Sequence, residues 1–189
     1  MKTVNVVLVA IVLMFSQGIY AQNFKVNPEK SNIEWLGKKL TGEHTGNILL
    51  KSGSFELKND KIVSGNFVVD MNSITCTDIE DKSYNQKLVG HLKSDDFFGV
   101  EKFPTANFVI SKAEKFVKGK AKVDGMITIK GKTEKISFVV NKKGNQFSSK
   151  VEIDRAKFNV KYGSDSFFDN LGDKVIDDIF VLDIVLAVK

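Results

Sequence analysis

Residues Asp178–Val188 read DIFVLDIVLAV and carry the clearest structural pattern in the chain. Every second position of this segment is large and apolar, and these positions are Phe180, Leu182, Ile184, Leu186 and Val188. The intervening positions are only partly apolar and are interrupted by Asp183. Side chains alternate between the two faces of a β-strand, so this period of two predicts a strand with two different faces. In a soluble protein, so long an apolar face can only turn toward the interior.

The same alternation runs through most of the chain. It predicts eight strands, near residues 32–40, 44–58, 62–71, 105–112, 115–129, 133–141, 146–162 and 178–188. Turn sequences such as Lys58-Asn59-Asp60 and Lys130-Gly131-Lys132 separate the strands. Helical patterns of 10–15 residues, which a parallel α/β sheet requires between its strands, do not alternate with them. The sequence therefore predicts an all-β protein with antiparallel strands, arranged as a barrel or a sandwich.

The apolar positions change parity after Ile153. Before this point the apolar residues are odd-numbered, as at Val151, and after it they are even-numbered, as at Phe158. One extra residue near Asp154-Arg155 would produce this shift, and a β-bulge supplies such a residue. We therefore expect one continuous strand over residues 146–162 with a bulge inside it.

The stretch Gly90–Phe108, GHLKSDDFFGVEKFPTANF, interrupts the alternation. Tyr84, Leu88 and Leu92 are spaced by four residues, which predicts a short amphipathic helix at this point. Pro104 favours extended backbone at the residue before it and so leads into the next strand. We expect a short helical insertion near residues 78–98, placed between two strands.

The N-terminal residues have the composition of a secretory signal peptide. Lys2 precedes an apolar run from Val6 to Phe15, and the small residue Ala21 stands at the expected cleavage site. The run is shorter than the about 18 apolar residues that span a bilayer, and no cysteine follows it to carry a lipid anchor. The sequence predicts a signal peptide over residues 1–21, a single domain over residues 22–189, and a periplasmic or secreted location.

Composition narrows the classes of partner. Cys76 is the only cysteine, so an intrachain disulfide is impossible. The formal net charge of +5 comes from lysine, with Arg155 as the only arginine. Specific nucleic-acid contacts favour arginine, and export removes a protein from most nucleic acid, so we expect no nucleic-acid partner. The lysines at 118, 120 and 122 and at 130, 132 and 135 are candidates for contact with a membrane surface, or are simply solvated.

Candidate catalytic and metal-binding groups are few. His44 and His91 are the two histidines, and their spacing matches no compact metal motif such as HExxH. The carboxylates closest to them in sequence are Glu43, Asp95 and Asp96. Hydrogen-bonded structural histidines are the simpler interpretation. Cys76 has no neighbouring histidine, and no GxSxG sequence is present. We predict no metal, no cofactor and no enzymatic activity.

Three segments resemble a known family. Gly90–Phe108 closely resembles the motif H-L-x-S-x-D-F-F-x-V-x-x-Y/F-P-x-x-x-F of the YceI-like family. Val123–Phe138, VDGMITIKGKTEKISF, resembles the family's hairpin G-x-L-T-I-K-G-x-T-x-x-V-x-F. Ile153–Val160, IDRAKFNV, resembles its D/S-R-x-x-F/Y-x-I segment. The motifs stand in the family's order, and the resemblance covers nearly all of Phe24–Val188.

The resemblance implies an eight-stranded antiparallel, lipocalin-like barrel that is exported and binds a long polyisoprenoid chain, including quinone-type lipids, in an apolar tunnel. Family members are not known as enzymes. Alternation then selects the candidate tunnel residues, which are Phe67, Val69, Phe108, Ile110, Ile127, Ile129, Phe138, Phe158, Phe180, Leu182 and Ile184. The helical insertion would close one end of the barrel, with His91, Phe97 and Phe98 as candidate plug residues.

Two other functions fit parts of the pattern. A small outer-membrane barrel also has eight alternating strands, but its lipid-facing side is apolar over about nine to eleven residues per strand. In this chain, lysines alternate through most strands. A histidine-dependent metal enzyme would need His44 and His91 within metal-bonding reach of each other or of a carboxylate. A protein that sequesters or carries a polyisoprenoid lipid remains the leading prediction.

Overall fold

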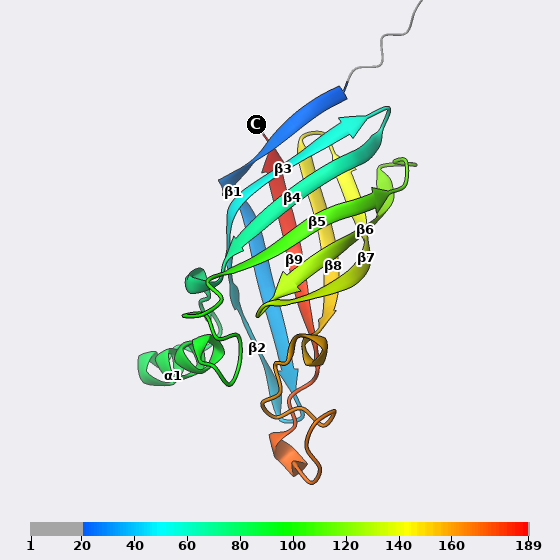
Figure 1. Cartoon of the computed structure of the whole chain (residues 1–189). Helices are drawn as coiled ribbons and strands as arrows, with labels where there is room; N and C mark the ends of the chain where they lie inside the picture. The colour runs from blue at the N-terminus through cyan, green and yellow to red at the C-terminus, as the bar shows by residue number, and fades with distance from the viewer. Residues whose placement is uncertain (1–20, 189) are drawn as a thin grey trace, which may run out of the picture.

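The computed structural model describes residues 21–188, which form one antiparallel sheet closed into a barrel (Figure 1). The strands are β1 (Ala21–Lys39), β2 (Gly42–Asn47), β3 (Leu49–Lys58), β4 (Lys61–Asp70), β5 (Thr105–Ala113), β6 (Lys120–Ile129), β7 (Lys132–Lys143), β8 (Gln146–Asp154) and β9 (Ile179–Val188). They are ordered β2-β1-β3-β4-β5-β6-β7-β8-β9, and pairing of β1 with β9 closes the barrel. Only Ile48 separates β2 from β3, which together form one bent strand, so the predicted all-β, eight-stranded antiparallel barrel is confirmed. The predicted signal peptide, residues 1–21, lies outside the described residues except for Ala21.

Strand β1 is long because its two halves have different neighbours. Residues 21–25 pair with β3, whereas residues 26–27 and 32–36 pair with β9. The register shifts between Asn27 and Asn32, where Pro28 cannot donate a ladder hydrogen bond. The predicted first strand, residues 32–40, is therefore only the second half of β1, because this shift breaks the alternation on which the prediction depended.

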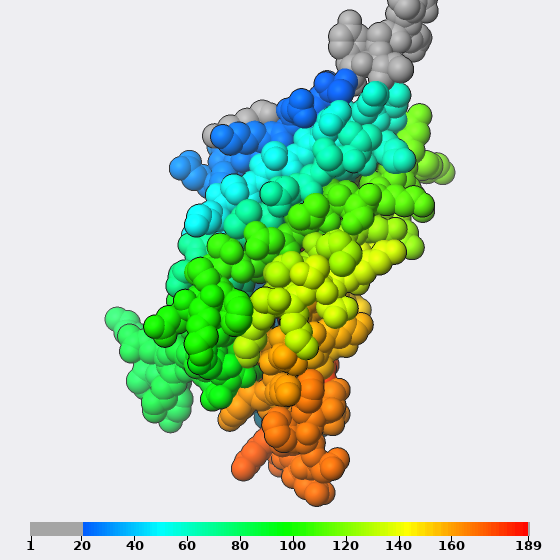
Figure 2. Space-filling model, viewed as in Figure 1, coloured from blue at the N-terminus to red at the C-terminus, as the bar shows by residue number. Residues whose placement is uncertain are grey.

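The predicted helical insertion is confirmed as α1 (Lys82–Lys93), which follows the short 3-10 helix η1 (Met71–Ser73). The carboxylate of Asp81 accepts hydrogen bonds from the first free amides of α1, and Ser94 ends the helix. Leu88 and Leu92 are half-buried, whereas Tyr84 is exposed. The helix projects beside one end of the barrel rather than lying inside it (Figure 2).

The predicted strand over residues 146–162 is wrong in its second half. Strand β8 ends at Asp154, whose side chain accepts a hydrogen bond from Ala156 N and starts the 3-10 helix η2 (Arg155–Phe158). Asn159, with φ of 59°, ends that helix in the left-handed region. The change of parity after Ile153 thus reflects departure from the sheet, not a β-bulge within it. A long connection with the short 3-10 helix η3 (Gly172–Lys174) then leads to β9.

Alternation sorts the side chains of the barrel as predicted. In β6, Val123, Ile127 and Ile129 are buried, and lysines occupy exposed positions between buried ones. The exposed lysines of β6 and β7 are Lys120, Lys122, Lys132, Lys135 and Lys143. None of the helices within residues 21–188 is both long enough and apolar enough to cross a membrane.

Candidate ligand-binding site

Two adjoining cavities occupy the barrel interior, with volumes of about 270 Å³ and about 120 Å³. They share part of their lining, which consists of Ile33, Val69, Ile127, Ile153 and Leu182. The larger cavity reaches the end of the barrel that carries α1, and the smaller one continues into the middle. Together they fall within the size range of small-molecule pockets, roughly 300–1,000 Å³.

All but one of the candidate tunnel residues line one or both of the cavities. Val69, Ile127 and Leu182 line both cavities. Ile129 and Phe180 line the larger cavity, and the smaller cavity is lined by Phe67, Phe108, Ile110, Phe138 and Ile184. Phe158 lies on η2, is only 1% exposed, and lines neither cavity. Alternation would place Phe158 in the tunnel only if the strand continued to residue 162, and β8 ends at Asp154.

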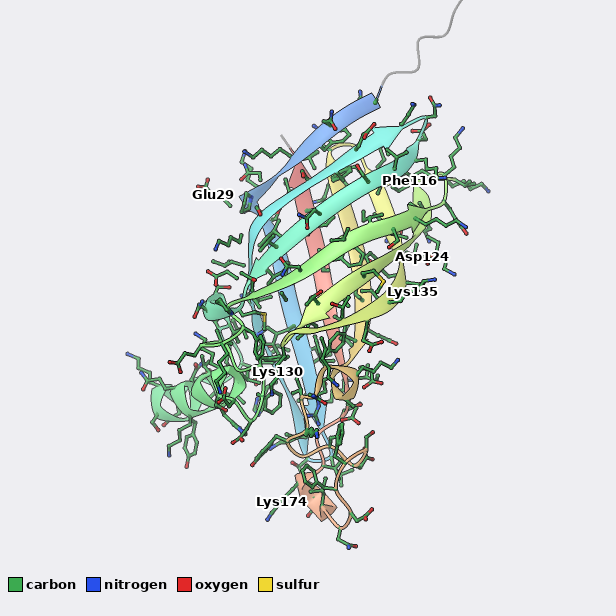
Figure 3. The ribbon with its side chains drawn as sticks, in the orientation of Figure 1. Glu29, Phe116, Asp124, Lys130, Lys135 and Lys174 are labelled. Atoms are coloured by element: carbon green, nitrogen blue, oxygen red, sulfur yellow. The ribbon has the colours of Figure 1, made fainter. Side chains whose placement is uncertain are left out.

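Packed phenylalanines close the end of the barrel opposite α1. The ring centroids of Phe24 and Phe55 lie 5.1 Å apart, and those of Phe55 and Phe147 lie 4.8 Å apart. Phe116 joins them with its ring centroid 6.2 Å from that of Phe147. Figure 3 shows Phe116 near this end and Lys130 near the end that carries α1. This packing leaves the α1 end as the mouth of the larger cavity.

The candidate plug residues gather at that mouth. His91, Phe97 and Phe98 all line the larger cavity. The Phe97 ring lies 5.4 Å from the His91 ring and 5.7 Å from the Phe98 ring, and Phe98 lies 6.1 Å from Phe180 of β9. The plug is therefore an aromatic cluster that joins the helical insertion to the last strand.

Lys130 fastens the plug to the barrel. Its ammonium group donates hydrogen bonds to the carbonyl oxygens of Phe97 at 2.5 Å and Asp95 at 2.7 Å. A longer bond, of 3.4 Å, reaches the carbonyl of Asn159 at the end of η2. Burial lowers the pKa of Lys130, against the opposing effect of Asp95 and Asp96. The sequence suggests only a solvated or membrane-contacting lysine at this position, because the carbonyl groups that Lys130 contacts carry no sequence signature.

Polar side chains line the larger cavity at its mouth. These residues are Lys38, Lys39, His44, His91, Arg155 and Asp177. In the smaller cavity, Ser148 and Ser149 are the polar residues among an otherwise apolar lining. The interior thus offers an apolar depth and a polar mouth, which suits a ligand with a long hydrocarbon chain and one polar end.

Arg155 is a buried structural centre beneath the mouth. Its guanidinium, 2% exposed, lies 3.2 Å from the carboxylate of Asp178 and stacks over the Phe97 ring at 5.5 Å. It also donates hydrogen bonds to the backbone carbonyl oxygens of Val160, Tyr162, Ile176 and Asp177. One arginine therefore holds η2, the following loop and the start of β9 together.

The other polar contact at the mouth joins His44 of β2 to Asp78, which precedes α1. Nδ1 of His44 lies 2.8 Å from the Asp78 carboxylate, which also accepts hydrogen bonds from Thr45 N and the Cys76 thiol. Burial alone would raise the pKa of Asp78, but these hydrogen bonds outweigh it and lower that pKa to about 2. Burial, with the hydrogen bond to Asp78, raises the pKa of Cys76.

The histidines do not build a metal site. His44 pairs with Asp78, whereas His91 packs edge-on against Tyr162 with ring centroids 4.3 Å apart. Within residues 21–188, no group of three or more histidine, cysteine or acidic side chains is arranged to hold a metal ion. The carboxylates suggested from sequence, Glu43 and Asp95, instead pair with Lys38 and Lys102.

Comparison with known proteins shows which family has this barrel. The YceI-like domain matches residues 24–187, which is most of the chain. The chain belongs to the YceI-like family. No curated protein matches this YceI-like chain.

Solved structures of several bacterial proteins share the YceI-like fold. BcnA of Burkholderia cenocepacia is 25% identical with a TM-score of 0.66, and the match covers 85% of this chain and 98% of BcnA. A polyisoprenoid binding domain from Saccharophagus degradans, implicated in plant cell wall breakdown, is 14% identical with a TM-score of 0.59, covering 88% and 97% of the two chains. The YceI protein of Campylobacter jejuni is 18% identical with a TM-score of 0.53, covering 100% and 99%.

Replacing both plug aromatics, Phe97→Ser with Phe98→Ser, is expected to loosen the mouth of the YceI-like barrel. Segments this short are not stable helices alone, so the plug depends on these aromatic contacts. Proteolysis between residues 77 and 102 should accelerate while the β-sheet circular dichroism signal persists. Tyr84→Ser, which removes an aromatic ring that is 65% exposed, is the matched control and should leave proteolysis unchanged. Equal protection in the double variant and the wild type would contradict this arrangement.

Asp78→Asn is expected to lower the free energy of unfolding by about 1 kcal/mol near neutral pH, through weakened hydrogen bonds. The folded-state pKa of about 2 lies below the ordinary 3.8, so the carboxylate stabilises the fold above about pH 4. That contribution is lost as the pH falls toward 2. Urea unfolding at about pH 6 and about pH 3 should therefore show the wild type and the variant converging in acid. Asp96→Asn, at an exposed carboxylate, is the control. A constant difference across this pH range would contradict the assignment.

Proposed function

We propose that this protein binds one polyisoprenoid lipid, polyprenyl or quinone-type, with its chain in the two adjoining cavities and its polar end at the mouth. The observation that carries the proposal is the interior itself, which is apolar from Phe108 and Phe138 to Ile129 and gains charged groups only at the α1 end. Family membership and the polyisoprenoid binding domain of similar fold support the same class of ligand.

Transfer of apolar surface out of water would drive binding. At about 25 cal/mol per Å², burial of several hundred Å² of polyprenyl chain supplies about 10 kcal/mol before the costs of ordering the chain. Single methylene groups discriminate weakly between ligands, so the volume and the length of the interior would select the chain more than any individual contact. The role is sequestration or carriage of a lipid, with no covalent chemistry.

The proposal also includes export of the protein and contact of its mouth with a membrane surface. The signal peptide predicted over residues 1–21 would direct the protein to the periplasm or the exterior. Exposed aromatic side chains gather in the connection near the mouth, at Tyr162, Phe167 and Phe168. Lys161 lies over the Phe167 ring with its ammonium 4.9 Å from the centroid. Aromatic rings with neighbouring lysines suit the headgroup region of a bilayer.

Organic extraction of the protein purified from its own host, followed by mass spectrometry, tests the proposal. We expect about one isoprenoid lipid per protein molecule. Repeated recovery of an empty barrel, or of phospholipid in the same mixture as the host membrane, would argue against an isoprenoid ligand.

A further inference from the structure

The barrel wall is incomplete between β7 and β8. Only residues 141–143 of β7 pair with β8, at residues 146–148, which makes this the shortest ladder in the described part of the barrel. The ladders on either side are long, because residues 132–141 of β7 pair with β6, and β8 pairs along its whole length with β9. Within residues 21–188, the β7–β8 ladder includes none of residues 132–140 and none of residues 149–154. We call these two unpaired stretches the β7–β8 seam.

The smaller cavity lies directly behind the seam. Its lining includes Ile136, Phe138 and Val140 from β7. It also includes Ser149, Val151 and Ile153 from β8. The three β7 side chains are only half-buried, although they face the interior, whereas Val151 and Ile153 are buried. A closed barrel has no unpaired strand edge, so this wall can part with fewer broken backbone bonds than any other.

Side chains replace the missing ladder at two places. The hydroxyl of Ser149 donates a 2.7 Å hydrogen bond to the carbonyl oxygen of Val139, directly across the seam. Ser149 is one of few buried polar residues in the described chain. An inward-facing strand position is usually apolar and does not need a hydroxyl group. At the tip of the β6–β7 hairpin, Lys130 bonds to the plug and to the end of η2. The hairpin is thus held on its free side by side-chain contacts that can break without disturbing the ladders.

We propose that the β7–β8 seam is a lateral gate through which a linear apolar chain enters and leaves the smaller cavity. The β6–β7 hairpin would swing outward about the residual pairing at residues 141–148, and the Ser149–Val139 hydrogen bond would hold it shut. This inference rests on the proposed binding of an apolar chain. A side opening allows a long chain to enter along its length, without threading end-first past the aromatic plug at the mouth.

The test measures gating separately from affinity. The probe is 1,6-diphenylhexatriene, a linear apolar fluorophore without a headgroup, and stopped-flow fluorescence gives its uptake and release rates. A gate that opens more often speeds both directions equally, so Ser149→Ala is expected to raise both rates about fivefold, the net effect of one hydrogen bond. Ser149 also lines the smaller cavity, so its replacement changes the affinity for the probe as well. A change in affinity alters only the ratio of the two rates, whereas a gate that opens more often raises both.

Ser137→Ala is the matched control. Ser137 lies on the same strand, but its hydroxyl donates a 2.5 Å hydrogen bond to Asp124 of β6, on the fully paired side of the hairpin. Its loss should leave both rates at wild-type values. If Ser149→Ala folds poorly, Ser149→Cys keeps a donor at the same position, although a weaker one, and is expected to give a smaller acceleration in the same sense.

Each outcome separates the gate from the proposed function. Wild-type protein that takes up no probe would overturn binding of an apolar chain, and the gate with it. Probe uptake with unchanged rates in the Ser149 variants would overturn the gate alone. Equal acceleration by Ser137→Ala and Ser149→Ala would also overturn it, because general loosening of β7 would then explain both. Acceleration by Phe97→Ser with Phe98→Ser, but not by Ser149→Ala, would assign the route to the plugged mouth instead.

Discussion

Arg155→Leu is expected to lower the free energy of unfolding by about 3–5 kcal/mol, which is the usual effect of removing one partner from a buried ion pair. The Asp178 carboxylate would keep its hydrogen bonds from Ser164 and Ser166 but would lose its cation. Four backbone carbonyl groups would lose their donors at the same time. Urea unfolding followed by circular dichroism measures the change.

Two further variants define what Arg155 contributes. Lys174→Leu removes an exposed lysine from the same connection and should change the free energy of unfolding by less than about 0.5 kcal/mol. Arg155→Lys retains the charge but cannot hold four carbonyl groups with one ammonium, so an intermediate loss is expected. A loss below about 1 kcal/mol for Arg155→Leu would show that the connection does not depend on this arginine.

Leu182→Trp is expected to remove or shorten the bound lipid while leaving the fold intact. Leu182 lies at the junction of the two cavities and lines both of them. A ring at this position would occupy ligand space, so overpacking, which costs about 1–3 kcal/mol in a filled core, should be largely avoided. Lipid mass per mole of folded protein, measured beside thermal melting, gives the result.

Lys122→Trp places the same ring on the outward face of β6, at an exposed position, and should leave lipid content at the wild-type level. The opposite result for Leu182→Trp is equally informative. A protein that melts much earlier, with lipid content per folded molecule unchanged, would show that Leu182 belongs to a packed core and that the ligand lies elsewhere.

Sequence patterns predicted most of the fold and most of the apolar interior. The eight strands, the helical insertion and the inward faces of β5, β6 and β9 agree with the structure, because each depends on a periodicity within a few residues. The failures occur where local rules compete. Pro28 and a register shift interrupt the alternation in β1, so the first half of this strand was not predicted. An Asp154 cap ended β8 where apolar spacing alone continued it, so Phe158 was wrongly assigned to a strand.

The contacts between polar residues of the candidate site could not be predicted from periodicity. The single arginine and the two histidines were noticed, but their partners were not predicted. His44 bonds to Asp78, 34 residues away, and Lys130 bonds to the carbonyl of Phe97, 33 residues away. Arg155 contacts backbone carbonyl groups, which every residue carries, so no residue type in the sequence marks them.

By itself, the sequence determined that this protein is an antiparallel β-structure with an apolar inside, because the two faces of a strand follow from the alternation of neighbouring residues. Only the tertiary structure decided how that inside is closed and where it can open. Phe24, Phe55 and Phe147 meet at one end, and Lys130 fastens the plug at the other. The ladder between β7 and β8 includes only residues 141–143 of β7. These features depend on the twist and stagger of whole strands around the barrel, which sum over the closed sheet and leave no local pattern in the chain.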